Sequence, residues 1–340
     1  YTIGGNKITL TNTTTQYPLY NYNYNSSTAF TYGKQCYINN NEFTSTTTGA
    51  IQMYGHYYYQ QDPQFNNNKL TFSSGAGGQT LYLGYYYQYN LVMNGNTMNL
   101  TSTTGALNVY NGYYYGENGF EFNNNVINMN STSGAQTHYA GYYTYYNTKA
   151  LHYNNNQVSM ISSTTGTVQN YFGYYNYTST ATGNEMKGNT ITLSTSATAA
   201  YNYMGYYFNG LDLSNNTVYV KSNGAAYGIY SYGNSGGTNP WIVKNNKVTC
   251  IGGTSTVYGF YNYYASNATV ANNVIFAKGN STCYAYIGGY NNGGGNFYNN
   301  TVHSEGTSTT YTFYVYESSG SQSATIRNNV FSRSAGGSGY

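Results

Sequence analysis

The chain has 340 residues, of which only 6% are charged, and its formal net charge is +3. Eleven basic residues over this length form no electrostatic footprint for a nucleic acid, and no run approaches the ~18 consecutive apolar residues of a membrane-spanning helix. Fifty tyrosines, with many Asn, Thr and Ser residues, supply polarity without charge. The composition therefore favours an ordered protein that neither binds nucleic acid nor spans a membrane.

An asparagine recurs twelve times in the same sequence frame, about every 29 residues. An apolar residue or Tyr stands three residues before it, Asn or Gly stands immediately before it, and an apolar residue stands two residues after it. A repeat of this length predicts a stacked array of one supersecondary unit. The repeated asparagines are Asn6, Asn41, Asn68, Asn96, Asn125, Asn156, Asn189, Asn216, Asn246, Asn273, Asn300 and Asn329.

Two short strands are predicted to flank each repeated Asn, because the residues on both sides of it alternate with period 2. Phe120-Glu121-Phe122 precedes Asn125, and Val126-Ile127-Asn128-Met129 follows it. One face of such strands is apolar and the other polar. The Asn or Gly before each repeated Asn suits a corner, since these residues tolerate left-handed backbone angles.

A third strand follows a Ser/Thr/Gly stretch such as residues 102–105 and opens with Gly, as in Tyr227-Gly228-Ile229-Tyr230. Gly holds this opening position in nine of the eleven complete units, and Pro18 and Thr312 replace it in the other two. Three short strands in ~29 residues predict one coil of a parallel β-helix, paired with its neighbours at ~4.8 Å. Residues 1–340 are thus expected to form one all-β, single-stranded β-helix of about 11–12 coils.

The repeated asparagines become an internal ladder in such a stack, because equivalent positions of successive coils lie above one another. Each side-chain amide can bond the amide of the next coil and also cap turn backbone groups. An unpaired buried amide costs about 1–3 kcal/mol, so the ladder requires an Asn on every rung. We interpret these residues as structural.

Tyr occupies the position two residues after the opening position in all eleven complete units. By alternation with Leu83, Phe172 and Ile287, which precede the Gly and should face inward, these tyrosines and the opening Gly should face outward. We predict an exposed tyrosine column beside a glycine groove. It either stiffens the sheet by offset stacking or binds a glycan or a protein. The tyrosines are Tyr20, Tyr57, Tyr86, Tyr114, Tyr143, Tyr175, Tyr207, Tyr230, Tyr261, Tyr290 and Tyr314.

Four residues are the only catalytic candidates: Glu121, His152, Glu185 and Asp212 share one outward slot in consecutive coils. Carboxylates stacked around a His could form an acid/base pair, as in glycosidases, or bind a cation. The other interpretation is that they are solvated charges that discourage edge-to-edge aggregation. No metal or cofactor is predicted.

Threonine and cysteine are the two remaining residue types with a possible pattern along the chain. Threonine arrays bind ice on some solenoids, but Thr46-Thr47-Thr48 and residues 162–165 are expected to fall in variable turns without a fixed strand register. Cys36, Cys250 and Cys283 are too few for a disulfide framework and are interpreted as small core residues. A Cys250–Cys283 bridge between neighbouring coils stays open.

The unit Ile326-Arg327-Asn328-Asn329-Val330-Phe331 resembles the right-handed, pectin-lyase-like β-helix repeats of large secreted proteins. Its Asn-Asn-x-apolar style is similar to cell-surface adhesins of Bacteroidetes-type bacteria. The resemblance implies a right-handed coil and an extracellular or cell-surface location. The enzymatic branch of that fold carries Asp clusters for calcium and Arg or Lys bases. This chain has only Arg327 and Arg333 as arginines, so the resemblance favours the adhesin or fibre branch.

These observations predict a structural or adhesive extracellular β-helix shaft that is not an enzyme and contacts a glycan or a neighbouring protein through its tyrosines. The alternative is a carbohydrate-active enzyme, a polysaccharide lyase or glycoside hydrolase. Both ends are expected to be cut mid-coil, so that the chain is a segment of a longer array or stacks end to end or laterally with copies of itself.

Overall fold

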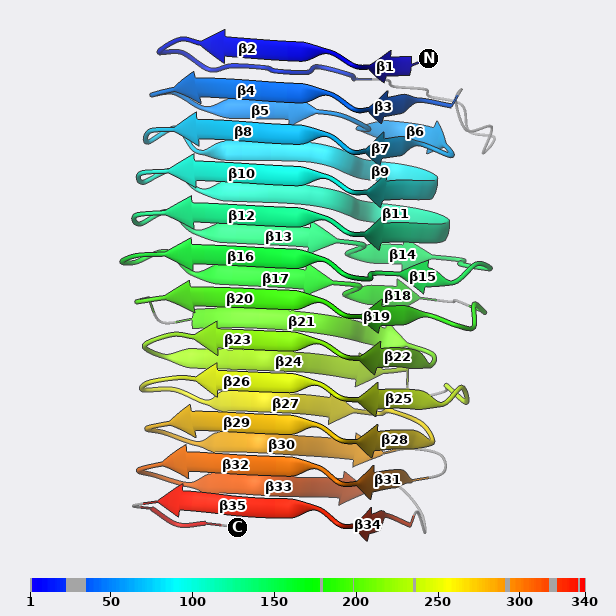
Figure 1. Ribbon diagram of the computed structural model, residues 1–340, viewed down its shortest axis with the longest axis vertical. Helices are drawn as coiled ribbons and strands as arrows, with labels where there is room; N and C mark the ends of the chain where they lie inside the picture. The colour runs from blue at the N-terminus through cyan, green and yellow to red at the C-terminus, as the bar shows by residue number, and fades with distance from the viewer. Residues whose placement is uncertain are drawn as a thin grey trace.

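The computed structural model describes residues 2–22, 35–177, 180–197, 199–234, 237–290, 294–317, 323–335 and 337–339. Within these ranges every regular element is a β-strand. The chain winds downwards as one continuous coil, with strands running right to left on the near side and left to right on the far side (Figure 1). This sense of winding is right-handed. The parallel β-helix expected from the repeat, and the right-handed coil implied by the resemblance, are therefore confirmed.

One sheet contains the strand that follows each repeated Asn and faces the viewer in Figure 1. Its neighbouring strands pair in parallel without a register shift, as between Thr97–Ser102 and Val126–Ser131. From β4 (Glu42–Thr47) to β32 (Thr301–Gly306), inner residues are buried and outer residues are exposed or half-buried in alternation. The twelve strands are β2 (Lys7–Thr11), β4 (Glu42–Thr47), β8 (Lys69–Ser74), β10 (Thr97–Ser102), β12 (Val126–Ser131), β16 (Gln157–Ser162), β20 (Thr190–Thr195), β23 (Thr217–Lys221), β26 (Lys247–Ile251), β29 (Val274–Gly279), β32 (Thr301–Gly306) and β35 (Val330–Ala335).

The remaining strands form a second sheet that covers the far side and turns toward the Asn corner. The short strands before the corners are β1 (Thr2–Gly4), β3 (Tyr37–Asn39), β7 (Gln64–Asn66), β15 (Leu151–His152), β19 (Glu185–Lys187), β22 (Leu211–Ser214), β25 (Trp241–Lys244), β28 (Ala268–Ala271), β31 (Gly295–Tyr298) and β34 (Thr325–Arg327). The far-side strands are β5 (Ile51–Tyr54), β6 (Tyr58–Gln61), β13 (Gln136–Ala140), β14 (Tyr143–Tyr145), β17 (Val168–Phe172), β18 (Tyr175–Tyr177), β21 (Ala199–Phe208), β24 (Ala225–Gly233), β27 (Val257–Tyr263), β30 (Cys283–Tyr290) and β33 (Thr310–Glu317). Two long strands, β9 (Gln79–Asn94) and β11 (Leu107–Asn123), span both regions.

Each corner between the two sheets is made by a left-handed residue followed by the repeated Asn. The residue before every repeated Asn has a positive φ, for example 58° at Asn124 and 69° at Gly95. Most side chains are excluded from this backbone region, whereas Asn and Gly are not. The turn chemistry read from the sequence is confirmed at all twelve corners.

The repeated asparagines form a buried ladder of hydrogen bonds. The backbone N–H and the Nδ2 of Asn96 both donate to Oδ1 of Asn125 at 3.0 Å, and Nδ2 also donates to the Phe65 carbonyl oxygen at 2.7 Å. The same three bonds recur on every rung from Asn41 to Asn300, and these ten side chains are at most 3% exposed. Each amide therefore ties its own coil to the coils on both sides.

A second asparagine ladder, which the sequence analysis missed, lies outside the first. The side chains of Asn39, Asn66, Asn94, Asn123 and Asn154 each accept the backbone N–H of the equivalent residue in the next coil at 2.8–2.9 Å. Its signal in the sequence is the run of three asparagines at residues 66–68, 123–125 and 154–156.

The interior is filled by columns of apolar side chains. Residues such as Leu70, Met98 and Ile127 occupy equivalent inward positions of successive strands and are fully buried. Burial of side chains of this size stabilises the fold by about 1.5–3 kcal/mol each. The three cysteines are buried and none of them forms a disulfide, in agreement with the core role inferred for them.

A row of hydrogen-bonded polar side chains also runs along the coil axis, from one far-side strand to the next. Asn111 donates from Nδ2 to Nε2 of His138 at 3.1 Å, and Nδ1 of His138 donates to Oδ1 of Asn170 at 2.7 Å. Asn170 in turn donates to Asn202 at 2.8 Å. This pattern fits a neutral imidazole, and burial lowers the pKa of His138 to about 4 although the bond to Asn170 acts in the opposite direction. His56 is also fully buried, and burial likewise lowers its pKa to about 4.

The ladder can be tested by the substitution Asn125→Ala. It removes the acceptor of two Asn96 donors and leaves them buried, so we expect a loss of about 3 kcal/mol or more in unfolding free energy, measured by urea denaturation. The control Asn6→Ala affects an exposed end of the same ladder, where water replaces the lost partner, and should cost less than about 1 kcal/mol. Equal losses in the two variants would contradict a ladder whose strength comes from burial.

The two core histidines should make the protein sensitive to acid. Because the pKa of His138 and of His56 is about 4 in the folded chain and about 6.5 in the unfolded chain, the unfolded chain binds more protons between these values. Their contribution to stability is complete above pH ~6.5 and falls by up to roughly 3 kcal/mol per histidine as the pH drops towards ~4.

The control is His138→Asn, which continues the Asn column between Asn111 and Asn170 without a titrating group. Urea denaturation near neutral pH and near pH ~4.5 should show a smaller acid loss for this variant than for the native chain. An identical loss would show that His138 does not bind the extra proton on unfolding.

Candidate contact surface

Tyrosines cover the outer face of the far-side strands in four columns that run along the coil axis. Each side chain is half-buried, because its neighbours in the array cover part of it. We call this set the tyrosine array. The first column is Tyr54, Tyr82, Tyr110, Tyr139, Tyr171 and Tyr203; the second is Tyr57, Tyr85, Tyr113, Tyr142, Tyr174 and Tyr206; the third is Tyr58, Tyr86, Tyr114, Tyr143, Tyr175 and Tyr207; the fourth is Tyr59, Tyr87, Tyr115 and Tyr145.

Rings stack along the first and second columns and along most of the fourth, whereas the third column also contains edge-to-face pairs, such as Tyr58–Tyr86 at 71°. In the second column the ring centroids of successive coils are 4.7–5.3 Å apart and their planes differ by 4–12°. Between columns, Tyr110 and Tyr113 lie 4.8 Å apart at 80°. Both geometries are favourable for aromatic pairs and contribute ~0.5–1.5 kcal/mol each. The array is therefore a rigid two-dimensional lattice of rings.

The prediction of a glycine groove beside the tyrosines is wrong, because the opening glycines face the core. A Cβ built on Gly112 would lie 3.0 Å from the Phe120 ring, and one on Gly141 would lie 2.1 Å from the Tyr153 hydroxyl. Both glycines have a positive φ, and the pairing of β9 with β11 shifts its register around Gly112. This kink changes the phase of the alternation, so that Tyr stands outward on both sides of an inward Gly.

The prediction that the eleven tyrosines form one column is also wrong, because their strand registers differ. The structure aligns Tyr86, Tyr114, Tyr143 and Tyr175 in the third column as predicted. Tyr57 belongs to the second column, since Tyr58 is the strand partner of Tyr86. Tyr20 pairs with Tyr54 and so extends the first column.

Further along the chain, the one-residue difference between Tyr82-Leu83-Gly84 and Tyr227-Gly228 shifts the frame again. Tyr230 is the partner of Tyr203 and not of Tyr207. Tyr261 stacks on Tyr230 with centroids 4.2 Å apart and parallel planes. Ile287, expected to face inward, takes the slot between Tyr261 and Tyr314, and Tyr290 pairs with Glu317 instead.

Three tyrosines of the fourth column are held in a left-handed backbone conformation. Their φ values are 35° at Tyr59, 51° at Tyr87 and 54° at Tyr115. A bulky residue in this region costs about 1–2 kcal/mol relative to Gly. The corners before the repeated asparagines use Asn or Gly instead. At the three tyrosines a ring is therefore present despite a local conformational cost.

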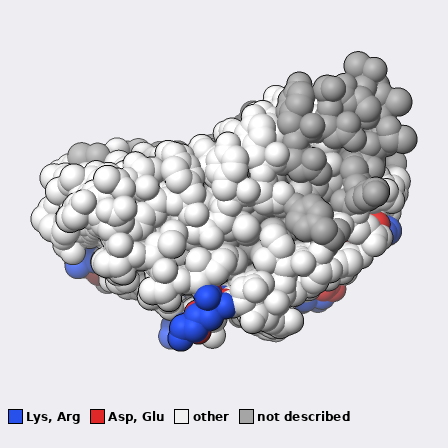
Figure 2. All heavy atoms as spheres, turned by 90° about the horizontal axis from the view of Figure 1, so that it is seen from above, with Lys and Arg blue, Asp and Glu red and all other residues white. Residues whose placement is uncertain are grey.

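Burial raises the pKa of the phenols in the first and second columns of the array. Burial, followed by the neighbouring tyrosines, raises the pKa of Tyr110 and of Tyr206 to about 12, and burial raises the pKa of Tyr139 and Tyr171 further. In the end-on view of Figure 2, the visible blue and red atoms lie along the lower and right margins. The array thus presents neutral hydroxyl groups and ring edges.

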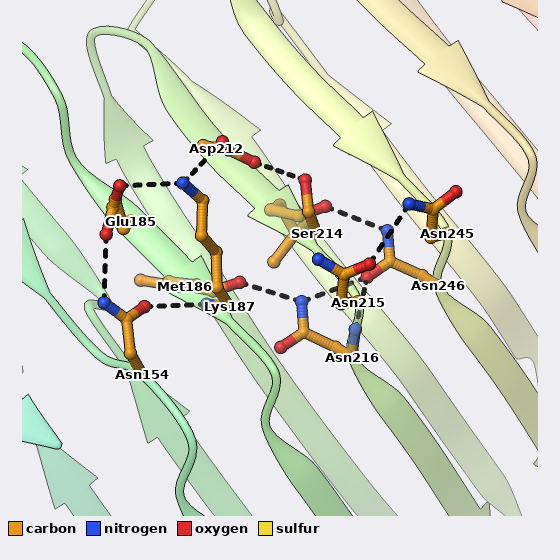
Figure 3. Close-up of polar contacts among 11 residues, drawn as sticks. Asn154, Glu185, Met186, Lys187, Asp212, Ser214, Asn215, Asn216, Asn245 and Asn246 are labelled. Carbon is orange, nitrogen blue, oxygen red and sulfur yellow. Dashed lines mark hydrogen bonds and ion pairs between the residues drawn. The ribbon is translucent and has the colours of Figure 1, made fainter. Parts of the chain in front are cut away.

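The four catalytic candidates do form one outward column, as predicted. Glu121 pairs with His152, His152 with Glu185, and Glu185 with Asp212, and all four side chains are half-buried. Lys187 lies between the two lower carboxylates, with Nζ 2.7 Å from Glu185 Oε1 and 2.8 Å from Asp212 Oδ2 (Figure 3). Burial raises the pKa of Glu185, but hydrogen bonds from Lys187 and Asn154 outweigh it and the net pKa is lowered.

Two shallow hollows lie beside this column. One of about 360 Å³ is lined by Glu121, His152, Asp62 and Lys149 above an apolar floor that includes Phe120. The other, of about 370 Å³, includes Glu185, Asp212 and Asn184. Neither hollow pairs an acid and a base that are free of other contacts. Lys187 neutralises Glu185 and Asp212, and Glu121 accepts a hydrogen bond from Asn94.

The expectation that threonines lack a fixed strand register is wrong for part of the chain. Thr46 lies in β4 and pairs with Thr11 on one side and Ser73 on the other. Thr44 likewise lies between Thr9 and Thr71. These side chains form outward columns on the twelve-stranded sheet, because the corner fixed by each repeated Asn sets the frame of the strand that follows it.

Comparison with known proteins finds no match, whether with family models, with curated proteins or with solved structures. Over the described ranges, no helix is long and apolar enough to cross a membrane, and no three His, Cys, Asp or Glu side chains gather as a metal site.

The substitution Lys187→Met tests the electrostatics of the acidic column. It removes the hydrogen bond and the positive charge that lower the pKa of Glu185, while burial, which raises this pKa, remains. NMR titration should therefore find a higher pKa for Glu185. The control Lys221→Met, on the outer face of β23, should leave it unchanged, and an unchanged pKa in Lys187→Met would show that Lys187 does not hold this carboxylate.

Proposed function

We propose that this chain is a structural β-helix shaft, secreted or displayed at a cell surface, that contacts an extended neutral glycan through the tyrosine array. The array is the observation that supports this role. It is a lattice of half-buried aromatic rings along one face of the coil, and aromatic side chains are enriched at binding surfaces because they offer large contact areas with few rotatable bonds.

The orientation of the rings favours an oxygen-rich partner. Where rings of neighbouring coils stack, as in the Tyr142–Tyr174 pair at 4.8 Å and 4°, their faces are covered and the groups left for a partner are ring edges and hydroxyls. Ring edges carry partial positive charge, and a phenol both donates and accepts hydrogen bonds. Sugar hydroxyl and ether oxygens complement both groups, and their lack of charge matches that of the array.

The spacing of the rungs favours an extended chain that runs parallel to the coil axis. Successive rings of a column repeat at 4.7–5.3 Å in the second column, which is about the length of one pyranose unit with its linking oxygen. Each coil would then offer one row of phenols to each sugar. Because neighbouring rings already hold these side chains in place, binding orders few new rotamers.

Lateral association of two shafts is the second candidate. Its support is the alternation of stacked and edge-to-face contacts inside the array, as between Tyr114 and Tyr115 at 4.3 Å and 82°. A facing array could continue the same pattern, since edge-to-face packing is self-complementary.

We propose no catalytic role for the acidic column. Its two closest carboxylates share Lys187 in an ion pair, and a proton-transfer role requires an acid and a base within reach of one substrate atom. A surface role that keeps the corner hydrated is consistent with this arrangement.

The contact role is tested by replacing Tyr114, Tyr143 and Tyr175 with Ser. We expect at least a ~10-fold loss of affinity for immobilised neutral polysaccharides, since central aromatic residues dominate interface energies. Sedimentation on the same variant reports self-association, and a change there alone would favour the second candidate.

The matched control replaces Tyr37, Tyr219 and Tyr298, three half-buried tyrosines outside the array, with Ser. It should bind as the native chain does. If neither glycan binding nor self-association responds to the first set, or if both sets respond equally, the array is not a contact surface.

A further inference from the structure

The fourth column of the array has a geometry suited to chemistry between its own rings. The centroids of Tyr59 and Tyr87 are 4.6 Å apart with planes 8° apart, and those of Tyr87 and Tyr115 are 4.6 Å apart with planes 4° apart. Near-parallel stacking at this distance holds the two rings of each pair face to face. The backbones of these three tyrosines also lie in the left-handed region.

The rings of the array are connected from one end of the coil to the other. A path of ring contacts leads from Tyr17 to Tyr314 with no centroid step longer than 5.9 Å. The fourth column is joined to this path through Tyr54, Tyr57, Tyr58, Tyr86 and Tyr87, whose successive rings are 4.6–5.4 Å apart. A phenoxyl radical formed at one ring can therefore pass to others before it reacts.

The other readily oxidised side chains are withdrawn from the surface. The seven methionines, among them Met129 and Met160, are fully buried, the three cysteines are buried, and Trp241 is 1% exposed. Oxidation depends on access to the side chain. An oxidant that approaches the described surface therefore meets tyrosines.

We propose that the fourth column is a site of oxidative modification, in which tyrosines of neighbouring coils are joined as dityrosine by hydrogen peroxide and a peroxidase-type catalyst. Tyr87 couples to Tyr59 or to Tyr115. The product is a covalent bond between coils at the edge of the array, and it stiffens the shaft where the backbone is strained.

The coupling balances with one peroxide for each bond. Two tyrosines each lose one electron and the phenolic proton, and the two radicals form a carbon–carbon bond between their Cε atoms. The hydrogen on each joined carbon then moves to the phenol oxygen through solvent, which restores both aromatic rings. The two electrons and two protons reduce hydrogen peroxide, whose O–O bond breaks to give two molecules of water.

The test is to treat the folded chain with a peroxidase and hydrogen peroxide and to map cross-linked peptides by mass spectrometry. We expect dityrosine that joins the peptide containing Tyr87 to those containing Tyr59 and Tyr115. The variant Tyr87→Asn should lose both cross-links and still fold, because Asn adopts the left-handed conformation readily. The control Tyr219→Asn, on the opposite sheet, should keep both.

Three results would overturn the proposal: no dityrosine in the folded chain when free tyrosine couples under the same conditions, unchanged yield in Tyr87→Asn, or the same scattered cross-links in the folded chain as in the chain unfolded in urea. None of them depends on glycan binding. The cross-linking proposal and the contact proposal can therefore fail separately.

Discussion

The side-chain amide of each repeated asparagine holds the structure in register. Its oxygen accepts two N–H groups from one neighbouring coil, and its nitrogen donates to a carbonyl oxygen of the coil before and to the amide of the coil after, as at Asn125. A slip of one residue at any corner would leave several of these groups buried without partners, at about 1–3 kcal/mol each. The left-handed residue before each Asn, such as Asn124, makes this placement sterically accessible.

The tyrosine array is a consequence of that register. Since the same corner recurs in every coil, the far-side strands place their tyrosines at equivalent positions of successive coils. Rings such as Tyr113 and Tyr142 therefore stack with centroids 5.0 Å apart and planes 10° apart. The ring contacts then stiffen the face that they form. The low charge of the chain fits both layers, because hydrogen bonds between amides and contacts between neutral rings link the coils, and ion pairs such as Lys187–Asp212 only supplement them.

The corners could be predicted from the sequence because their chemistry is local. Asn-Asn or Gly-Asn followed by alternating residues specifies the left-handed turn, the buried amide and the next strand, and this is why the fold and the column of Glu121, His152, Glu185 and Asp212 were placed correctly. The outward positions of the far-side strands were predicted less well, because period-2 alternation was expected to continue through Gly112 and its equivalents. A left-handed glycine that faces Phe120 resets the phase, and only the packing of the core decides where that reset falls. The same error placed Ile287 inside and Tyr20, Tyr57 and Tyr290 in one column.

The most direct measurement is the hydrogen exchange of asparagine side-chain amides by NMR on Asn-labelled protein. If the ladder holds the coils together, the Nδ2 hydrogens of Asn125 and Asn156 should exchange as slowly as the backbone amides of the core, since both require the coils to separate. Those of Asn124 and Asn155, which are exposed at the same corners, should exchange at the rate of an unprotected amide. Equally fast exchange at all four residues would contradict the ladder as the interaction on which the structure depends.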